Sequence, residues 1–227
     1  MTATKPSLAG LYVGASGFSY PSWKPDFYPA DARPQEFLRH YAARLPSVEL
    51  NTTGYRLPAE EQFDRWAAAV PDSFRFAVKM PPRGIRQIAG FEERVRRLGN
   101  RLGPVRAVVQ SVRDDGVLEL LLGSVDPELR YAFDFRHDSW EVPEVDVRLA
   151  QAGVVRVNAA DGGAAFRYLR FRDPPYSEEE LQLFAASVSA LLAEGADVFA
   201  YFRHEEAPTA PRYAERLREL VRNAACA

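Results

Sequence analysis

The sequence predicts an α/β fold, most economically a single (β/α)8 barrel of the TIM type spanning residues 1–227. Short apolar runs alternate with longer amphipathic segments, eight such runs can be counted, and no linker or internal repeat interrupts them. An open doubly wound sheet is the alternative. No G-x-G-x-x-G or Walker pattern follows the first run, which favours the barrel.

The predicted strands are short segments rich in Val, Leu, Phe and Tyr. They span residues 11–14, 48–51, 74–79, 105–110, 131–135, 154–158, 168–171 and 197–201. Parallel strands of a barrel are covered on both faces, so nearly continuous apolar runs are typical of them. The alternation with helices therefore indicates parallel strands with right-handed crossovers.

The predicted helices repeat apolar residues at helical spacing. They span residues 36–45, 60–70, 91–101, 116–122, 145–152, 177–194 and 208–221. Ser177 and Glu180 form a capping-box pattern, and Gly153 and Gly195 are predicted helix stops. The Gly-rich link after the sixth strand is too short for a full helix, so one helix is expected to be missing or degenerate between strands six and seven.

Composition and charge exclude several partners and cofactors. The net charge is −2 and the isoelectric point about 6.0, so no global basic field attracts nucleic acid or a membrane. Cys226 is the one cysteine, which excludes an internal disulfide, and the histidines lack metal-ligand spacing. We expect no metal, no cofactor and no membrane partner. The N-terminus lacks a signal-peptide pattern, so a cytoplasmic location is expected; the oligomeric state is not predicted.

Charged and polar residues share one parity of several predicted strands. In a barrel this parity faces the axis, while the apolar parity faces the helices. The residues concerned are Glu49, Asn51, Lys79, Asp134, Arg136 and Arg170. Two interpretations stay open: a structural ion network, or a binding site with a positive excess. Active sites of barrel enzymes lie at the carboxyl ends of the strands, where most of these residues fall.

Loops at the same ends add further candidates. The segment 14–17 contains Ser16 and could offer backbone N–H groups to an anion, although a plain tight turn is the favoured interpretation. The segment 136–140 contains His137, a candidate general acid or base, and Trp140. Trp23 lies in an aromatic loop and is predicted to cap the barrel or to line a pocket.

The chain resembles the YecE-like family, a domain of unknown function. Matching stretches run in order through the chain: GASGFSYPSW (14–23), FYP (27–29), VELNTTGYRLP (48–58), PDSFRFAVK (71–79), LGNRLGP (98–104), AFDFRHDSW (132–140) and VFAYFRHEEAPTAPRYA (198–214). The resemblance implies a TIM-type barrel and no particular reaction. The chain departs from the family pattern at Arg170–Asp173 and Phe202–His204, where arginines are added, which suggests a more anionic ligand.

Together these observations predict a protein that binds a small anionic or phosphorylated ligand at the carboxyl-end mouth of the barrel. If it is an enzyme, His137 with Asp134 or Glu49 would carry protons. The expected ligand contacts come from Arg136, Lys79, Arg170, Asn51, Ser16, Tyr55 and Trp140. The alternatives are a nucleic-acid-binding or phosphodiester-cleaving protein, with Trp23 and Trp140 stacking on bases, and a non-catalytic interaction barrel.

Overall fold

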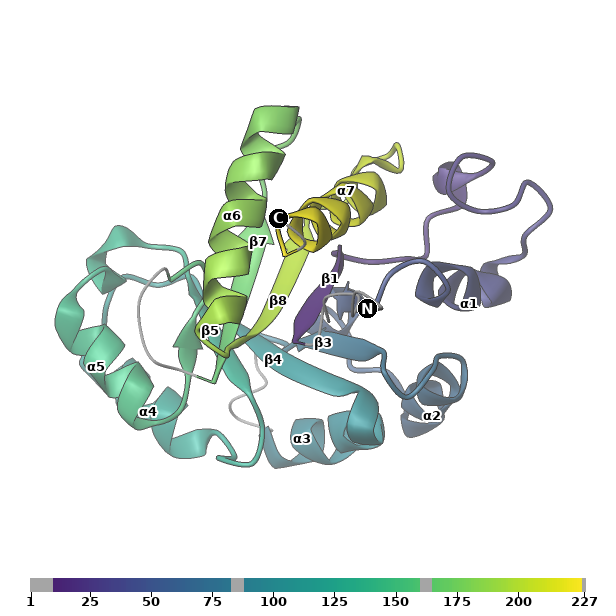
Figure 1. Ribbon diagram of the computed structural model, residues 1–227. Coiled ribbons are helices and arrows are strands. Elements are labelled where there is room, and N and C mark those ends of the chain that lie inside the picture. The colour runs from purple at the N-terminus through teal and green to yellow at the C-terminus, as the bar shows by residue number, and fades with distance from the viewer. Residues whose placement is uncertain (1–9, 83–87, 160–164, 226–227) are drawn as a thin grey trace, which may run out of the picture. The chain divides into compact units, whose positions relative to one another are not determined.

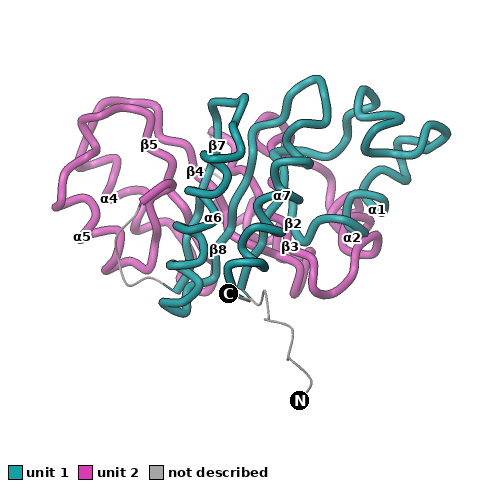
Figure 2. Tube along the Cα trace, turned by 45° about the horizontal axis from the view of Figure 1, so that its top comes forward, with its two compact units in different colours: residues 1–48, 165–227 teal, residues 49–164 magenta. Residues whose placement is uncertain are grey.

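The computed structural model describes residues 10–82, 88–159 and 165–225 and shows an α/β protein built on parallel strands (Figure 1). Its contacts divide the chain into unit 1, residues 1–48 and 165–227, and unit 2, residues 49–164 (Figure 2). In the described part of the chain the strands form two sheets. One is ordered β1 (Leu11–Ala15), β8 (Asp197–Phe202), β7 (Phe166–Phe171), and the other β2 (Ser47–Leu50), β3 (Arg75–Lys79), β4 (Leu102–Val109), β5 (Tyr131–Phe135), β6 (Val155–Arg156). Every strand pair whose register is defined is parallel, which confirms the predicted α/β class.

Unit 1 is built around β8, which pairs with β1 on one side and β7 on the other. Its elements are β1 (Leu11–Ala15), α1 (Phe37–Ala42), β7 (Phe166–Phe171), α6 (Glu178–Ala193), β8 (Asp197–Phe202) and α7 (Thr209–Ala224). Helices α6 and α7 pack against each other, and α7 also covers β1 (Figure 1). Val13 of β1 and Val198 and Phe202 of β8 are fully buried, and the Phe202 ring contacts Tyr213 of α7.

Unit 2 contains most of the second sheet and the helices that connect its strands. Its elements are β2 (Ser47–Leu50, which begins in unit 1), α2 (Glu60–Ala68), β3 (Arg75–Lys79), α3 (Ile88–Arg96), β4 (Leu102–Val109), α4 (Asp115–Ser124), β5 (Tyr131–Phe135), α5 (Pro143–Gln151) and β6 (Val155–Arg156). Asp114 caps α4, since its Oδ1 accepts hydrogen bonds from the Gly116 and Val117 N–H groups at 2.8 and 3.2 Å.

The predicted helix boundaries at Ser177, Gly153 and Gly195 are confirmed. The hydroxyl of Ser177 accepts from the Glu180 N–H at 3.2 Å, and the Glu180 carboxylate accepts from the Ser177 N–H at 2.8 Å. Gly153 and Gly195 have positive φ angles of 68° and 87°, which residues with a side chain rarely adopt. Local chemistry therefore determines where these helices begin and end.

The sixth strand is shorter than predicted. β6 ends at Arg156 instead of reaching residue 158, because Asn158 adopts a left-handed conformation with φ of 64° that turns the chain out of the sheet. Between β6 and β7 the described residues contain no helix, as the short Gly-rich link predicted; residues 160–164 of that link lie outside the description.

The start of β2 lies against β1 through a very close backbone approach in unit 1. A Cβ on Gly14 would lie 1.9 Å from the Ser47 carbonyl oxygen, so only glycine fits there. The buried Tyr41 hydroxyl accepts from the Ala15 N–H at 2.7 Å and donates to the Ser47 oxygen at 3.0 Å. Burial raises the pKa of Tyr41, which keeps this hydroxyl a donor.

A second buried polar contact joins α3 to the amino end of β5 in unit 2. The Tyr131 hydroxyl donates to Glu92 Oε1, which also accepts from the Asp126 N–H at 3.1 Å. Burial and this hydrogen bond raise the pKa of Tyr131. Glu92 was not among the residues predicted from the sequence, because its position on a charged helix resembles that of a solvent-exposed acid.

Candidate functional site

Charged and polar side chains gather at the carboxyl ends of the strands in unit 2. We call this group the strand-end cluster: Glu49, Asn51, Lys79, Arg106, Asp134 and Arg136. In the strand register, Lys79 is the Cα partner of Arg106, and Arg106 is the partner of Ala132. Side chains of in-register partners lie on the same face of a sheet, and Asp134 follows Ala132 on that face. Strand pairing therefore brings these residues together.

Arg106 is the centre of the strand-end cluster. Its Nη1 lies 2.5 Å from Glu49 Oε1 and its Nε lies 3.0 Å from Asp134 Oδ2. It also donates to Asn51 Oδ1 at 3.3 Å. The exposed fractions of the Glu49, Arg106 and Asp134 side chains are 0, 3 and 2%. Charges this deeply buried are tolerated only when they are paired and hydrogen-bonded.

Arg136 extends the cluster to the surface. Its Nη2 lies 3.1 Å from Asp134 Oδ2, and its side chain is 33% exposed. The charges therefore alternate from a buried glutamate through Arg106 and Asp134 to a solvent-accessible guanidinium. A chain of this kind holds its outermost cation in a defined position, because each inner group constrains the next.

Lys79 forms the second accessible part of the cluster. Its Nζ lies 4.8 Å from the centroid of the Tyr55 ring, a cation–π contact. The Tyr55 ring is 84% exposed, so this contact lies at the surface. The predicted site residues Glu49, Asn51, Tyr55, Lys79, Asp134 and Arg136 thus fall in one connected group of unit 2.

The strand-end cluster carries an excess of positive charge. It contains three basic side chains, Lys79, Arg106 and Arg136, against the carboxylates of Glu49 and Asp134. The parity of the strands predicts such an excess from Lys79, Arg136 and Arg170, but Arg106 was not among the predicted residues. The signal was present, because Arg106 is the one charged residue of β4 and has the parity opposite to Val105 and Ala107.

His137 and Trp140 lie in the loop after β5 and have structural roles there. His137 is exposed, and its Nδ1 accepts from the Ser139 N–H at 3.2 Å, which places the proton of the neutral ring on Nε2. Trp140 is fully buried, stacks on Phe135, and donates through Nε1 to the Ser111 carbonyl oxygen at 2.8 Å. A ring buried in this way offers no face to a ligand.

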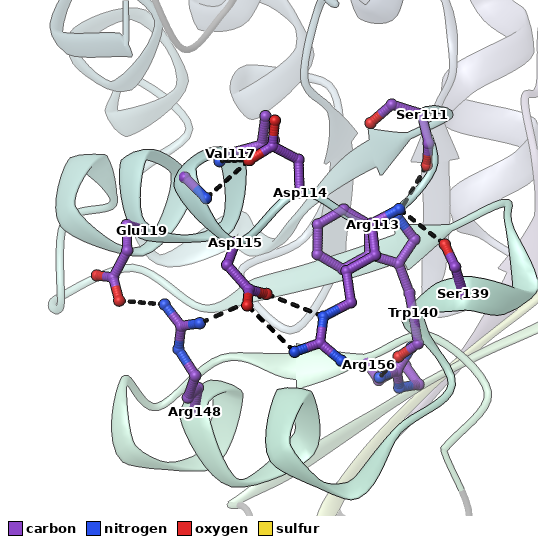
Figure 3. A network of polar contacts seen from close by, with 11 residues as sticks. Ser111, Arg113, Asp114, Asp115, Val117, Glu119, Ser139, Trp140, Arg148 and Arg156 are labelled. Atoms are coloured by element: carbon purple, nitrogen blue, oxygen red, sulfur yellow. Dashed lines mark hydrogen bonds and ion pairs between the residues drawn. The ribbon is translucent and has the colours of Figure 1, made fainter.

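Further polar contacts fix this loop to its neighbours (Figure 3). The Arg113 N–H donates to Ser139 Oγ at 2.7 Å, joining the loops that follow β4 and β5. Arg156 donates to the Trp140 carbonyl oxygen at 2.8 Å, and Arg148 pairs with Glu119 across α4 and α5. These contacts restrain the segment that begins at Arg136, and so they support the position of the outer cation.

The remaining predicted residues, Ser16 and Arg170, belong to unit 1. Ser16 is 1% exposed, and its hydroxyl accepts from the His204 N–H at 3.1 Å, so it holds the loop after β8. Arg170 lies on β7 as the register partner of Tyr201 and is half-buried.

Two loop predictions for unit 1 are decided by the contacts there. The contacts of the segment 14–17 favour the plain tight turn over an anion-binding turn, because the N–H groups of Ala15, Ser16 and Gly17 already donate to protein oxygens. Trp23 is fully buried and donates to the Glu205 carbonyl oxygen at 3.2 Å. Its ring therefore caps the loop instead of lining a pocket.

The structure also bears on metals and membranes. Among the described residues, no three or more His, Cys, Asp or Glu side chains are grouped so that they could hold a metal ion. Within the same residues, no helix is both long enough and apolar enough to cross a bilayer. Cys226 lies outside the described residues.

Two curated proteins are similar to the chain in sequence. The chain is 29% identical to the UPF0759 protein YecE of Escherichia coli K12 over 65% of this chain and 58% of that protein. The YecE protein of Escherichia coli O157:H7 is 29% identical over 56% of this chain and 48% of its own length. The chain thus spans about half to three fifths of the curated relatives it matches.

Solved structures extend the similarity to nearly the full chain. A DUF72 family protein from Thermotoga maritima matches with a TM-score of 0.82 and 25% identity, covering 93% of this chain and 98% of that one. A DUF72 family protein from Enterococcus faecalis matches with a TM-score of 0.78 and 18% identity over 93 and 95% of the chains. The model of the family described as "Protein of unknown function DUF72" matches residues 12–226. The chain therefore belongs to the DUF72 family, which confirms the YecE-like resemblance.

Proposed function

We propose that the chain is a single (β/α)8 barrel that binds a small anionic ligand, such as a phosphorylated metabolite, at the carboxyl ends of its strands. Two observations support barrel closure. The parallel order β1-β8-β7 and β2 to β6 is that of a barrel opened at two seams. At one seam the Tyr41 hydroxyl bridges Ala15 of β1 and Ser47 of β2. The ligand proposal itself rests on unit 2 alone.

The observation that carries the ligand proposal is the positive excess of the strand-end cluster together with its gradient of burial. Arg106 is used to balance the buried carboxylates, whereas Arg136 and Lys79 lie toward the surface. The interaction of an anion with a partly desolvated basic group is stronger than with a fully hydrated one, so such a group favours anion binding. The buried carboxylates then act as supports that orient the outer cations.

The proposal covers binding and includes no reaction. Glu49 Oε1 is paired with Arg106, and Asp134 Oδ2 is paired with Arg106 and Arg136, so these oxygens face cations instead of a substrate proton. His137 is an exposed cap of the turn that follows. The role predicted for these residues as proton carriers has no support in their contacts.

The alternative functions have weaker support. A nucleic-acid surface was predicted to use Trp23 and Trp140 as base-stacking rings, but both are fully buried. An interaction barrel would need a contiguous apolar patch. Of the large exposed hydrophobic side chains of the described residues, no two lie on the same helix: Tyr55 and Val112 are in loops, Leu120 is on α4, Val147 on α5 and Leu183 on α6.

A thermal-unfolding experiment tests the proposal. Ribose 5-phosphate at about ten times its dissociation constant should raise the unfolding midpoint by roughly 3–5 °C, and ribose at matched ionic strength should not. Arg136→Met should abolish the shift. Arg97→Met is the matched control, because Arg97 is also an ion-paired arginine of unit 2 but directly follows α3 and pairs with Glu60 and Asp64 of α2. No shift with any of a broad panel of phosphorylated compounds would refute the proposal.

A further inference from the structure

Tyr55 is a large aromatic side chain that stays almost entirely in solvent. It follows the short 3-10 turn Thr52–Gly54 at the carboxyl end of β2, and it is 84% exposed. Of the large hydrophobic side chains exposed in the described part of the chain, it is the one aromatic. Its position at the ligand-binding ends of the strands distinguishes it from scattered surface residues.

The turn beneath Tyr55 is rigid. The Thr53 hydroxyl lies 2.6 Å from the Leu50 carbonyl oxygen and 2.8 Å from that of Lys79, so it ties the turn to β2 and β3. The Tyr55 N–H donates to the Thr52 oxygen at 3.1 Å. A ring mounted on a fixed turn loses little conformational entropy when a ligand binds to it.

Lys79 connects this ring to the strand-end cluster. Its aliphatic stem passes directly over Gly54, where a Cβ would lie 2.4 Å from Lys79 Cδ. The stem thereby delivers Nζ to 4.8 Å from the centroid of the Tyr55 ring. At its other end, Lys79 is the Cα register partner of Arg106. An aromatic surface and a basic cluster are therefore adjacent within unit 2.

We infer that the anionic ligand carries a planar aromatic ring, which stacks on Tyr55 while its charged group is held by Lys79 and Arg136. This inference rests on the proposed function and narrows it to aromatic phosphates and similar aromatic anions. Stacking on an exposed tyrosine stabilises the binding of a planar aromatic group. The adjacent Lys79 ammonium favours a ligand that is also negatively charged. A single exposed ring suits one aromatic group and not a run of nucleobases.

Two phosphate esters of similar size and equal charge distinguish a preference for an aromatic ring from binding of the phosphate group alone. 1-Naphthyl phosphate is planar and aromatic, whereas decahydro-1-naphthyl phosphate has the same carbon skeleton but is saturated and puckered. We expect titration calorimetry to show that the wild-type chain binds 1-naphthyl phosphate about tenfold more tightly than decahydro-1-naphthyl phosphate. Tyr55→Leu should reduce this ratio to about twofold, and Tyr55→Phe, which keeps the ring, should preserve it. Since position 55 is exposed, circular dichroism should show that both variants are folded.

The outcomes distinguish the inference from the proposed function. Equal binding of the two esters, lost in Arg136→Met, would overturn the aromatic inference and leave the anion site standing. Binding of neither ester, nor of the wider panel, would overturn both. Salt-dependent binding of oligothymidylate at least tenfold tighter than that of 1-naphthyl phosphate would overturn the small-ligand inference in favour of single-stranded nucleic acid.

Discussion

Unit 2 buries carboxylates near both ends of its strands, and it satisfies them in two different ways. At the amino end of β5, Glu92 accepts from neutral donors, the Tyr131 hydroxyl and the Asp126 N–H. At the carboxyl ends, Glu49 and Asp134 form ion pairs with Arg106, and Asp134 also pairs outward with Arg136. The first arrangement is complete with these two neutral donors. The second needs cations, and it places a positive group where a ligand can reach it.

This difference shows how a structural group can be distinguished from a binding site. The neutral donors satisfy the hydrogen-bonding capacity of the Glu92 carboxylate locally, and they join α3 to β5. A guanidinium has five N–H donors in a planar fork, so it binds several partners and can pass constraints from one residue to the next. We therefore assign Glu92 to the stability of unit 2 and the strand-end cluster to both stability and binding.

The largest effect is expected from Arg106→Met, which removes the central cation and leaves two carboxylates buried. Breaking a buried ion pair by removing one partner costs about 3–5 kcal/mol, and here one substitution breaks two pairs. Urea unfolding of the variant should show a loss at the upper end of this range, or failure to fold. If the variant is too unstable to purify, Arg106→Lys keeps one charge and should lose less.

Asp134→Asn is expected to cost about 3 kcal/mol in the same assay. The side chain is only 2% exposed, so solvent cannot screen the guanidinium groups that the variant leaves without this carboxylate. A measured cost near 1 kcal/mol would show that water enters the inner part of the cluster. It would also move Asp134 from the supporting groups to the ligand contacts.

Tyr131→Phe tests the amino-end contact and should destabilise by about 1–2 kcal/mol. The variant leaves Glu92 with the Asp126 N–H as its remaining described donor. The expected loss is the usual cost of leaving a buried hydrogen-bond acceptor partly unsatisfied. Ligand binding should be unchanged, because this contact belongs to the opposite ends of the strands. A loss of anion binding in this variant would break the distinction between the two ends.

The smallest effect is expected from Arg97→Met on the surface of unit 2. The hydrogen bond from Arg97 lowers the pKa of Asp64, so the stability it contributes is present above the ordinary aspartate pKa and is lost as the pH falls. Wild type and variant should therefore differ slightly at pH 7 and converge below about pH 3 in thermal unfolding. A difference that persists or grows in acid would contradict this assignment.

The local sequence determined the order of elements and the chemistry of their ends. The alternation of apolar runs predicted the parallel α/β class, and Ser177, Gly153 and Gly195 marked helix ends, because capping and positive φ depend on a few neighbouring residues. The parity of β2, β3 and β5 also predicted which charged residues share one face. The side-chain patterns of strands and helices have periods of two and 3.6 residues, so they can be recognised in a single sequence.

Only the tertiary structure decided which of these residues meet and which are buried. It placed Arg106 between Glu49 and Asp134, which are far from it in sequence, because strand register and not spacing brings them together. It also buried Trp140 while leaving Tyr55 in solvent, although both were predicted ligand contacts. The burial of an aromatic ring depends on distant segments packing over it, and no local pattern records that packing.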